Sequence, residues 1–366
     1  MPSGICARTF IATLALVTVW AAGSPAHAAC DSKKALGVER VVEVDTTNGP
    51  RLGHVQYKDI DFLRPGEVVL TFDDGPSNQM TPKVLDALDA HCTKAIFFMV
   101  GRMAIAYPDM ARRVAENGHT VASHTWSHKN LARLSSKNVE KEVELGLSAI
   151  SAALGKPIAP FFRFPYLSDS RRSISHLETR DHAIISIDVD SYDWKTRTTS
   201  RMSSNVFSQL DKRGKGIILF HDIQRVTANG LKGLLDELKR RKYKVVQLVP
   251  KSTAATLAPY DDMAKKLFAK KSKIAVSNAL TTRSVVWPLS GSMEPSQTVV
   301  RPASQPSLKP KPAAVTVAAD DVDEPVSRSS TNSSTKHRSD AQPGPAKPTP
   351  RQRSEPTLFE EVFGKF

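Results

Sequence analysis

Short apolar runs recur along the middle of the chain, and a segment with helical periodicity follows most of them. Each run is five to seven residues long and is rich in Val, Ile, Leu and Phe. Runs of this length and composition are typical of strands buried on both faces. The predicted strands lie at residues 67–72, 95–100, 119–123, 160–164, 183–189, 216–220 and 243–248.

The segments between the runs place apolar residues at steps of three and four. In residues 136–154, for example, Val139, Val143, Leu147 and Ile150 follow this spacing, which is typical of an amphipathic helix. Helices are predicted at residues 81–91, 108–117, 136–154, 199–213 and 228–241. Repeated strand–helix units predict an α/β fold with a parallel sheet, and about seven strands in roughly 185 residues favour a barrel over two domains.

The first 28 residues have the features of a secretory signal peptide. Arg8 provides a positive charge, residues 10–22 form an apolar run, and residues 26–28 (AHA) provide an A-x-A cleavage site. The run is too short for a comfortable membrane span, and no other segment is long and apolar enough to cross a bilayer. The sequence therefore predicts export, to the periplasm, the cell wall or the medium. A lipoprotein anchored at Cys30 is the weaker alternative, because a histidine stands where a small apolar residue is expected.

The regions on either side of the alternating segment lack its pattern. Residues 29–65 are predicted to be an N-terminal arm, and residues 251–366 a low-complexity, mostly disordered tail with one charged stretch compatible with a helix. Residues 287–356 contain 12 of the 24 prolines and many Ser, Thr, Lys and Arg residues. Such a composition buries too little apolar surface to offset the entropy of ordering the chain.

The chain is basic, with a formal net charge of +14 and 40% hydrophobic residues. An excess of positive charge is typical of proteins that meet nucleic acid, anionic membranes or acidic polymers. A solubilising tail explains the same excess and is the preferred interpretation. The charge alone therefore identifies no partner.

The chain has three cysteines, Cys6, Cys30 and Cys92. Cys6 leaves with the signal peptide, and the remaining two can pair in an oxidising compartment. A bridge between Cys30 and Cys92 and two unpaired thiols both remain open. No C-x-x-C spacing is present, which disfavours a cysteine-based metal site.

Two adjacent carboxylates, Asp73 and Asp74, follow the apolar run at 67–72 and precede a Gly-Pro turn. Like charges at close range repel, so such a pair usually needs a cation, a partner or a shifted pKa. If Asp74 binds a cation, Asp73 can stay ionised beside it as a base. The alternative is that both residues only cap the following helix.

His124 and His128 lie just past another predicted strand, four residues apart. In a helical or turn-like loop this spacing places both rings on one side, where they can share a metal ion. Carboxyl ends of parallel strands meet at one face of a barrel, so Asp74 is expected to join them. Two histidines and one carboxylate leave positions open for water and substrate, as a catalytic site requires.

Three further stretches follow strand ends: RFPY (163–166), DSYDW (190–194) and LFHD (219–222). Each has an ordinary interpretation alone: Arg163 as a surface ion pair, Trp194 as a core aromatic and His221 as a buried histidine with its hydrogen bonds satisfied. Their shared position at successive strand ends is what those interpretations do not explain.

Together these stretches resemble the motifs of the polysaccharide deacetylase family, carbohydrate esterase family 4, which includes the nodulation chitooligosaccharide deacetylases. The motifs appear in the family's order, as TFDDGP (71–76), the His-x3-His stretch (124–128), RFPY, DSYDW and LFH (219–221). The resemblance covers about residues 66–250, which would be the catalytic domain. It implies a distorted (β/α) barrel and metal-dependent removal of acetyl groups from N-acetylglucosamine units.

The resemblance also implies roles for individual residues. Asp74, His124 and His128 would bind a divalent metal, usually zinc, with Co²⁺, Ni²⁺ or Mn²⁺ as alternatives. Asp73 would be the general base, and Arg163 would keep it ionised.

On the opposite side of the substrate, His221 would be the general acid and Asp193 would tune it. Pro165, Tyr166, Trp194 and Leu219 would contact the substrate, the backbone N–H of Tyr166 would face the oxyanion, and Trp126 would offer a further apolar wall.

Two other functions compete with the deacetylase. A non-catalytic wall-binding or polysaccharide-binding protein would need neither Asp73 nor His221, and a metallopeptidase would usually need a glutamate beside its histidines. The expected partner is a glycan containing N-acetylglucosamine, and no nucleic acid is expected. The sequence does not distinguish chitooligosaccharide, peptidoglycan glycan and an exported biofilm polymer, and it predicts no oligomeric state.

Overall fold

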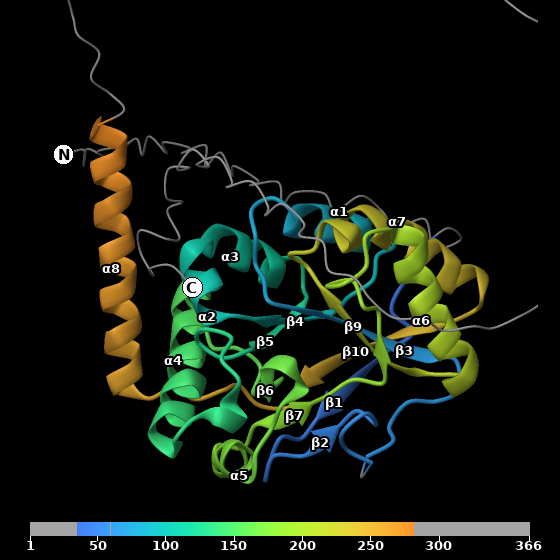
Figure 1. The fold of residues 1–366 in the computed structure, drawn as a ribbon, viewed down its shortest axis with the longest axis horizontal. Coiled ribbons are helices and arrows are strands. Elements are labelled where there is room, and N and C mark those ends of the chain that lie inside the picture. Colours follow the sequence, from blue (N-terminus) through green and yellow to red (C-terminus); the bar gives the residue numbers. More distant parts are fainter. Residues whose placement is uncertain (1–34, 59, 282–366) are drawn as a thin grey trace, which may run out of the picture. The chain divides into compact units, whose positions relative to one another are not determined.

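The computed structural model describes residues 35–58 and 60–281, with the backbone alone for residues 272–281. Ten strands and eight α-helices alternate over most of this range, with the strands at the centre of the domain and the helices outside them (Figure 1). The strands are β1 (Arg40–Val44), β2 (Arg51–Leu52), β3 (Glu67–Asp73), β4 (Ile96–Met99), β5 (Thr120–Ser123), β6 (Phe161–Phe162), β7 (Ala183–Ile185), β8 (Val189–Asp190), β9 (Gly216–His221) and β10 (Lys244–Pro250). The α-helices are α1 (Thr81–Ala90), α2 (Gly101–Ala106), α3 (Pro108–Glu116), α4 (Ser136–Leu154), α5 (Arg171–Thr179), α6 (Thr199–Arg213), α7 (Arg225–Arg240) and α8 (Ala258–Thr281), and two 3-10 turns cover Leu131–Arg133 and Pro165–Leu167.

All strand pairings among the described residues are parallel, as the alternating pattern predicts. β9, β3, β4, β5, β6 and β7 are neighbours in that order. β7 and β8 are two parts of one stretch, and β8 pairs with β9. The sheet therefore returns to its starting strand through residues 183–190, which confirms an α/β barrel with one interrupted wall.

The structure contains two strands that were not predicted from the sequence, and it divides a third, predicted strand into two. β1 and β2 lie in the predicted arm, where β1 pairs with β10 and β2 with β7. They were missed because β2 has two residues and β1 exposes alternate side chains, including Val41 at 57%. The predicted strand at 183–189 is split into β7 and β8.

All five predicted helices are present, with bounds within a few residues of those expected, which were 81–91, 108–117, 136–154, 199–213 and 228–241. Two were missed. α2 has only six residues, and α5 buries only Ser173 and Leu177, so neither shows a strong apolar stripe.

Alternation along β3 explains how polar groups reach the inside of the barrel. Val68, Leu70 and Phe72 belong to the large core between strands and helices, whereas Val69 belongs to a second cluster with Ile96, Phe98, Phe161, Ile185 and Ile217. Because side chains alternate between the faces of a strand, Thr71 and Asp73 lie on the same face as Val69. That inner face changes from apolar to polar at the carboxyl end of β3.

The charged stretch in the predicted tail forms part of α8, which packs on α4. Ala264 of α8 is fully buried, in a cluster with Ile105, Leu145 and Ala149. The packed domain therefore extends beyond residue 250, and the predicted tail after residue 281 lies outside the described residues. Among the helices described, none combines the length and the apolarity that a membrane span requires.

The predicted signal peptide also lies outside the described residues. Cys92 is disulfide-bonded. Because Cys6 and Cys30 both lie outside the described range, the pairing of Cys92 with Cys30 stays a prediction.

Candidate active site and metal centre

The candidate residues come from the carboxyl ends of neighbouring strands. Asp73 and His221 are the last residues of β3 and β9 and stand opposite each other in the strand register. His124 directly follows β5, and Arg163 directly follows β6. The parallel sheet thus brings residues that are far apart in sequence to one end of the barrel, as predicted.

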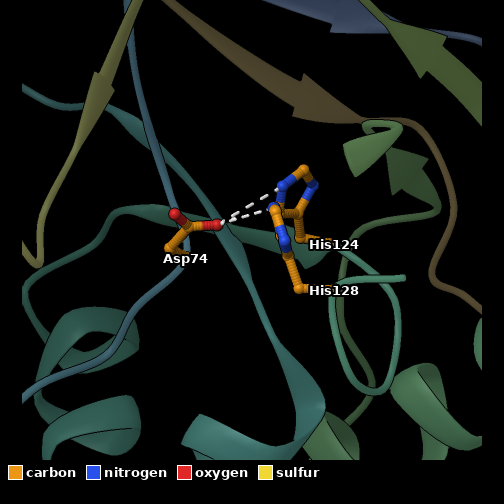
Figure 2. A group of neighbouring side chains, drawn as sticks. All are labelled: Asp74, His124 and His128. Carbon is orange, nitrogen blue, oxygen red and sulfur yellow. Dashed lines mark ion pairs between the residues drawn. The ribbon is translucent and has the colours of Figure 1, made fainter. Parts of the chain in front are cut away.

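Asp74, His124 and His128 form a cluster whose potential ligand atoms all lie within 4.8 Å of one another. Asp74 Oδ1 is 3.6 Å from His124 Nε2 and 3.2 Å from His128 Nε2. Both rings face the carboxyl group, as Figure 2 shows. This arrangement brings together the three residues that the sequence places at two strand ends.

The His124 ring is held with a free nitrogen toward Asp74. Its Nδ1 lies 2.8 Å from the carbonyl oxygen of Arg163 and, as the N–H donor, leaves the lone pair on Nε2. Burial lowers the pKa of His124 well below its usual value, and the neighbouring His128 adds to the effect. A neutral imidazole with this tautomer is the form that binds a metal.

The Asp74 carboxylate fits the same interpretation. Its Oδ1 is buried and accepts no hydrogen bond from the described residues. An unpartnered buried carboxylate oxygen is costly, and a cation between it and the two imidazoles would satisfy it. Two nitrogens and one oxygen are donors suited to zinc and to similar divalent ions. The residues present therefore fit a divalent metal.

Ligand-bearing loops in this cluster have unusual backbone conformations. Asp74 and His128 have φ values of 76° and 58°, in the left-handed region that residues other than glycine rarely adopt. Such strain is retained only where surrounding structure enforces it, and it is concentrated at functional sites.

Asp73 is paired with a fully buried arginine. Arg163 Nη1 donates to Asp73 Oδ1 at 2.8 Å, and the two side chains are 0% and 4% exposed. Arg163 also donates to Thr71 Oγ1 and to the carbonyl oxygens of Ile185 and Ser186. The interpretation of Arg163 as a surface ion pair is therefore excluded.

Burial raises the pKa of Asp73 to about 6, although the charge of Arg163 opposes the rise. The carboxyl group is thus ionised at neutral pH and still basic enough to accept a proton.

The alternative that Asp73 and Asp74 cap the following helix is wrong. Helix α1 begins at Thr81 after Met80, and its first turn has neither a side-chain cap nor an acidic residue.

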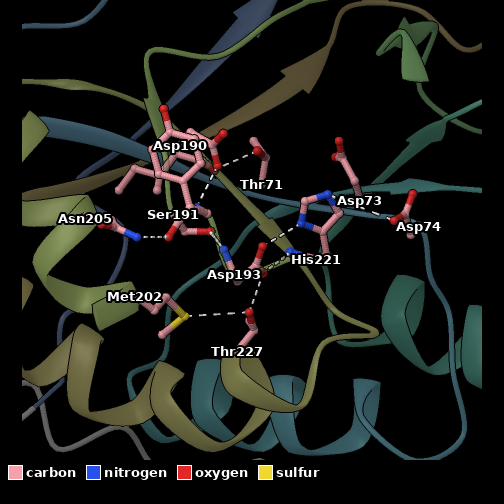
Figure 3. A network of polar contacts seen from close by, with 12 residues as sticks. Thr71, Asp73, Asp74, Asp190, Ser191, Asp193, Met202, Asn205, His221 and Thr227 are labelled. Carbon is pink, nitrogen blue, oxygen red and sulfur yellow. Dashed lines mark hydrogen bonds and ion pairs between the residues drawn. The ribbon is translucent and has the colours of Figure 1, made fainter. Parts of the chain in front are cut away.

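His221 forms a second polar pair on the other side of the aspartates. Its Nδ1 lies 2.7 Å from Asp193 Oδ1, and its Nε2 lies 4.0 Å from Asp74 Oδ2 (Figure 3). Burial would lower the pKa of His221, but the hydrogen bond and charge of Asp193, with the charges of Asp74 and Asp73, raise it to about 9. The pair with Asp193 therefore favours the protonated ring of His221 at neutral pH.

The residues predicted to contact substrate divide into two groups. Tyr166 and Trp194 are 68% and 54% exposed, so Trp194 is not a core aromatic. Tyr166 also stands edge-on to the His128 ring, with centroids 4.7 Å apart. Pro165 and Leu219 are buried, Leu219 within β9 beside Thr71. Contact of any of them with substrate stays a prediction.

Three polar residues around the site were not assigned from the sequence. Thr71 accepts a hydrogen bond from Arg163, Thr227 donates one to Asp193, and buried Asp222 accepts one from Thr81. Burial raises the pKa of Asp222 to about 7. Thr71 and Asp222 lie within the quoted stretches TFDDGP and LFHD, whereas Thr227 lies on α7 and has no sequence signal.

Comparisons with known proteins agree with this geometry. The sequence model of a family described as polysaccharide deacetylase matches residues 63–183. A peptidoglycan-N-acetylglucosamine deacetylase of Listeria monocytogenes is 34% identical over 181 residues, which cover 50% of this chain and 38% of that protein. The chain thus spans well under half the length of that relative.

A chitooligosaccharide deacetylase of a Bradyrhizobium strain is 34% identical over 166 residues, covering 45% of this chain and 74% of that protein. Among solved structures, a peptidoglycan deacetylase of Bdellovibrio bacteriovorus matches with a TM-score of 0.54 and 32% identity, over 60% of this chain and 61% of that one. On its motifs, its fold and these similarities, the chain belongs to the polysaccharide deacetylase family.

Proposed function

We propose that this protein is a metal-dependent hydrolase that removes acetyl groups from N-acetylglucosamine residues of a glycan. The main observation behind the proposal is the cluster of Asp74, His124 and His128, which lies between a buried Asp73–Arg163 pair and a His221–Asp193 pair. A metal site, a base and an acid at one barrel end are the components that amide hydrolysis requires.

Asp74, His124 and His128 are the proposed metal ligands, with zinc favoured over cobalt, nickel or manganese. A divalent ion supplies Lewis acidity, which polarises a carbonyl oxygen and makes water easier to deprotonate. The backbone N–H of Tyr166 is proposed to hydrogen-bond to the developing oxyanion.

The proton transfers are assigned to the protein's own residues. Asp73 Oδ2, which lies 3.8 Å from His124 Nε2, is the proposed acceptor of the proton from water, while Oδ1 stays bonded to Arg163. His221, protonated at neutral pH, donates its Nε2 proton to the leaving amine. Asp193 holds the ring through Oδ1, and its Oδ2 is itself fixed by the backbone N–H of His221 at 2.7 Å and by the Thr227 hydroxyl.

Trp194 and Tyr166 are proposed to form walls against which a sugar ring packs. Leu219 and Pro165 are proposed to line the floor beneath the acetyl methyl group. The products would be acetate and a glucosamine unit.

Charge at the mouth of the barrel favours an acidic glycan. In residues 124–135, 163–172, 191–198 and 222–225, which follow β5, β6, β8 and β9, the exposed charged side chains of the described structure are all basic. They are Lys129, Arg133, Arg171, Arg172, Lys195, Arg197 and Arg225. Basic side chains on these loops attract a substrate of the opposite charge. We therefore favour a glycan with carboxylate groups beside its acetamido sugars over neutral chitooligosaccharide.

The domain assignments and the location are also proposals. Residues 1–28 are proposed as a signal peptide and residues 66–250 as the catalytic domain, with α8 packed against it. The names of the peptidoglycan-acting relatives support an extracytoplasmic location. A binding protein without activity is the alternative, and the buried Asp73–Arg163 and His221–Asp193 pairs argue against it, since binding alone needs neither.

Acetate release tests the proposal. The purified chain would be incubated with an acetylated chito-oligomer, with peptidoglycan glycan and with an acetylated exported polymer, each with chelator and after metal is restored. The proposal is supported if chelator abolishes acetate release and added metal restores it. No release from any of the three after metal is restored would refute it.

A further inference from the structure

Between His124 and His128 the chain forms a tight loop that rests on helix α4. Glu142 of α4 is 4% exposed, and its carboxylate accepts two hydrogen bonds from Ser127: from the backbone N–H at 2.8 Å and from the hydroxyl at 2.7 Å. Glu142 is thus a buried acidic group that contacts the loop between the two proposed histidine ligands, and the proposed reaction does not use it.

The backbone of the same loop is also fixed by α4. The Trp126 N–H donates to the Glu142 carbonyl oxygen at 2.7 Å. One turn further along the helix, Gly146 lies so close that a Cβ atom there would be 2.6 Å from the carbonyl carbon of Thr125. Only glycine allows α4 to approach at this point.

Helix α2 holds the loop from another direction. The backbone N–H groups of Gly101 and Arg102 donate to the carbonyl oxygens of Thr125 and Trp126 at 2.9 and 3.0 Å. Within the loop, the His128 N–H donates to Thr125 Oγ1 at 2.9 Å. The side chain of Glu142 therefore supplements a framework of backbone hydrogen bonds.

The loop needs this support because its conformation is strained. Thr125 and His128 have φ values of 72° and 58°. A loop with two non-glycine residues in the left-handed region relaxes unless its hydrogen bonds enforce the conformation. The distance between the His124 and His128 rings depends on the conformation of the residues between them.

Lys129 also pairs with Glu142 but cannot supply the same constraint. Lys129 Nζ lies 3.5 Å from the carboxylate, but its side chain is 62% exposed. An exposed, screened ion pair contributes little. The two hydrogen bonds to Ser127 are the contacts by which this buried carboxylate holds the loop.

From this geometry we infer that Glu142 is a positioning residue, which holds His124 and His128 at the separation that metal binding requires. The inference rests on the proposed metal site. Outer partners of metal ligands typically change metal affinity about 10- to 100-fold when they are removed. Replacing Glu142 should therefore weaken metal binding in a protein that still folds.

Metal affinity of the purified full chain tests this without an activity assay. The metal-free protein is titrated with Zn²⁺ against a chromophoric chelator, and with Co²⁺ to record the visible spectrum of the bound ion. Glu142→Leu, which keeps the bulk and removes both acceptors, is expected to weaken Zn²⁺ binding about 10- to 100-fold and to change the Co²⁺ spectrum. Glu142→Gln keeps an acceptor for the Ser127 N–H, so it should restore most of the affinity.

Glu144→Leu is the matched control. Glu144 is a second fully buried glutamate on α4, but its partners are His176 and Arg180 of the α5 region, not the loop. This change should lower thermal stability and leave Zn²⁺ affinity and the Co²⁺ spectrum unchanged. Ser127→Ala, which removes one of the two hydrogen bonds, gives a milder variant in case Glu142→Leu fails to fold, and it should weaken binding less.

Two results would overturn the inference. One is a Zn²⁺ affinity equal to that of the unchanged protein in Glu142→Leu or, if that variant fails to fold, in Ser127→Ala. The other is an equal loss of affinity in Glu144→Leu, which would mean that general destabilisation is the cause. If the unchanged protein itself binds no divalent ion, the proposed function fails together with the inference, whereas normal binding and turnover with an unaffected Glu142→Leu refute the inference alone.

Discussion

Replacing Asp73 with asparagine separates its proposed chemistry from its structural role. Asparagine has nearly the same shape, and its Oδ1 can still accept the hydrogen bond that Arg163 Nη1 makes at 2.8 Å. The other bonds of Arg163, to Thr71 and to the carbonyl oxygens of Ile185 and Ser186, involve no atom of Asp73. The loss in stability should therefore be smaller than the roughly 3–5 kcal/mol expected when a buried ion pair loses one partner outright.

The loss in activity should be large because an amide cannot accept the proton from water. A positioned general base contributes about 10²- to 10⁴-fold, equivalent to roughly 3–5 kcal/mol of activation free energy. We expect kcat for acetate release to fall by that factor in Asp73→Asn, with bound metal, measured by elemental analysis, unchanged. Asp74→Asn serves as the control and should lose metal as well as turnover. Turnover in Asp73→Asn within a few-fold of the unchanged protein would refute the base role.

Three further predictions concern charge, metal and pH. Lys195→Gln should raise KM for an acidic glycan by about 1.4- to 5-fold at low salt, as expected of one exposed charge worth about 0.2–1 kcal/mol, while KM for a neutral chito-oligomer stays constant. Equal effects on both substrates would contradict the charge argument. Metal at about 100 times its Kd should stabilise the unchanged protein by about 2.7 kcal/mol in denaturant titrations, and His128→Ala should abolish this gain; a gain that persists would place the metal elsewhere. His119 is buried, and burial lowers its pKa to about 3. Below the pKa of about 6.5 in the unfolded state, the unfolded chain binds a proton that the folded protein does not, so stability decreases as the pH is lowered. At pH 5 this effect lowers the free energy of unfolding by about 2 kcal/mol. His119→Gln should therefore reduce the difference in urea stability between pH 7 and pH 5, and an unchanged difference would show that His119 is not its cause.

Strand ends explain why much of the site could be predicted from the sequence. Asp73, Asp74, His124, Arg163 and His221 each end or directly follow an apolar run, and parallel topology brings such positions to one end of the barrel. Local pattern and topology together determine which residues meet, so a single sequence was enough to propose the cluster.

Supporting contacts were not predictable in the same way. Glu142 and Glu144 occupy the stretch EKEVE of α4, where alternating charges resemble a solvated helix face, yet both are buried against other elements. Thr227 reaches Asp193 from α7, 34 residues further along the chain. Such contacts depend on how a helix is rotated and packed, which hydrophobic periodicity determines only coarsely.

The short strands show a second limit. β2 has two residues, and β1 exposes alternate side chains at the edge of the sheet, so neither buries enough apolar surface to produce a recognisable run. Their pairing with β7 and β10 is determined by neighbouring strands rather than by their own composition.

The position of a bound metal tests the central claim most directly. Crystals grown with zinc would be measured on both sides of the zinc absorption edge to locate the ion by its anomalous signal. The account predicts a peak about 2.0–2.2 Å from His124 Nε2, His128 Nε2 and Asp74 Oδ1. A fully occupied zinc ion elsewhere, with these three side chains directed away from one another, would contradict it.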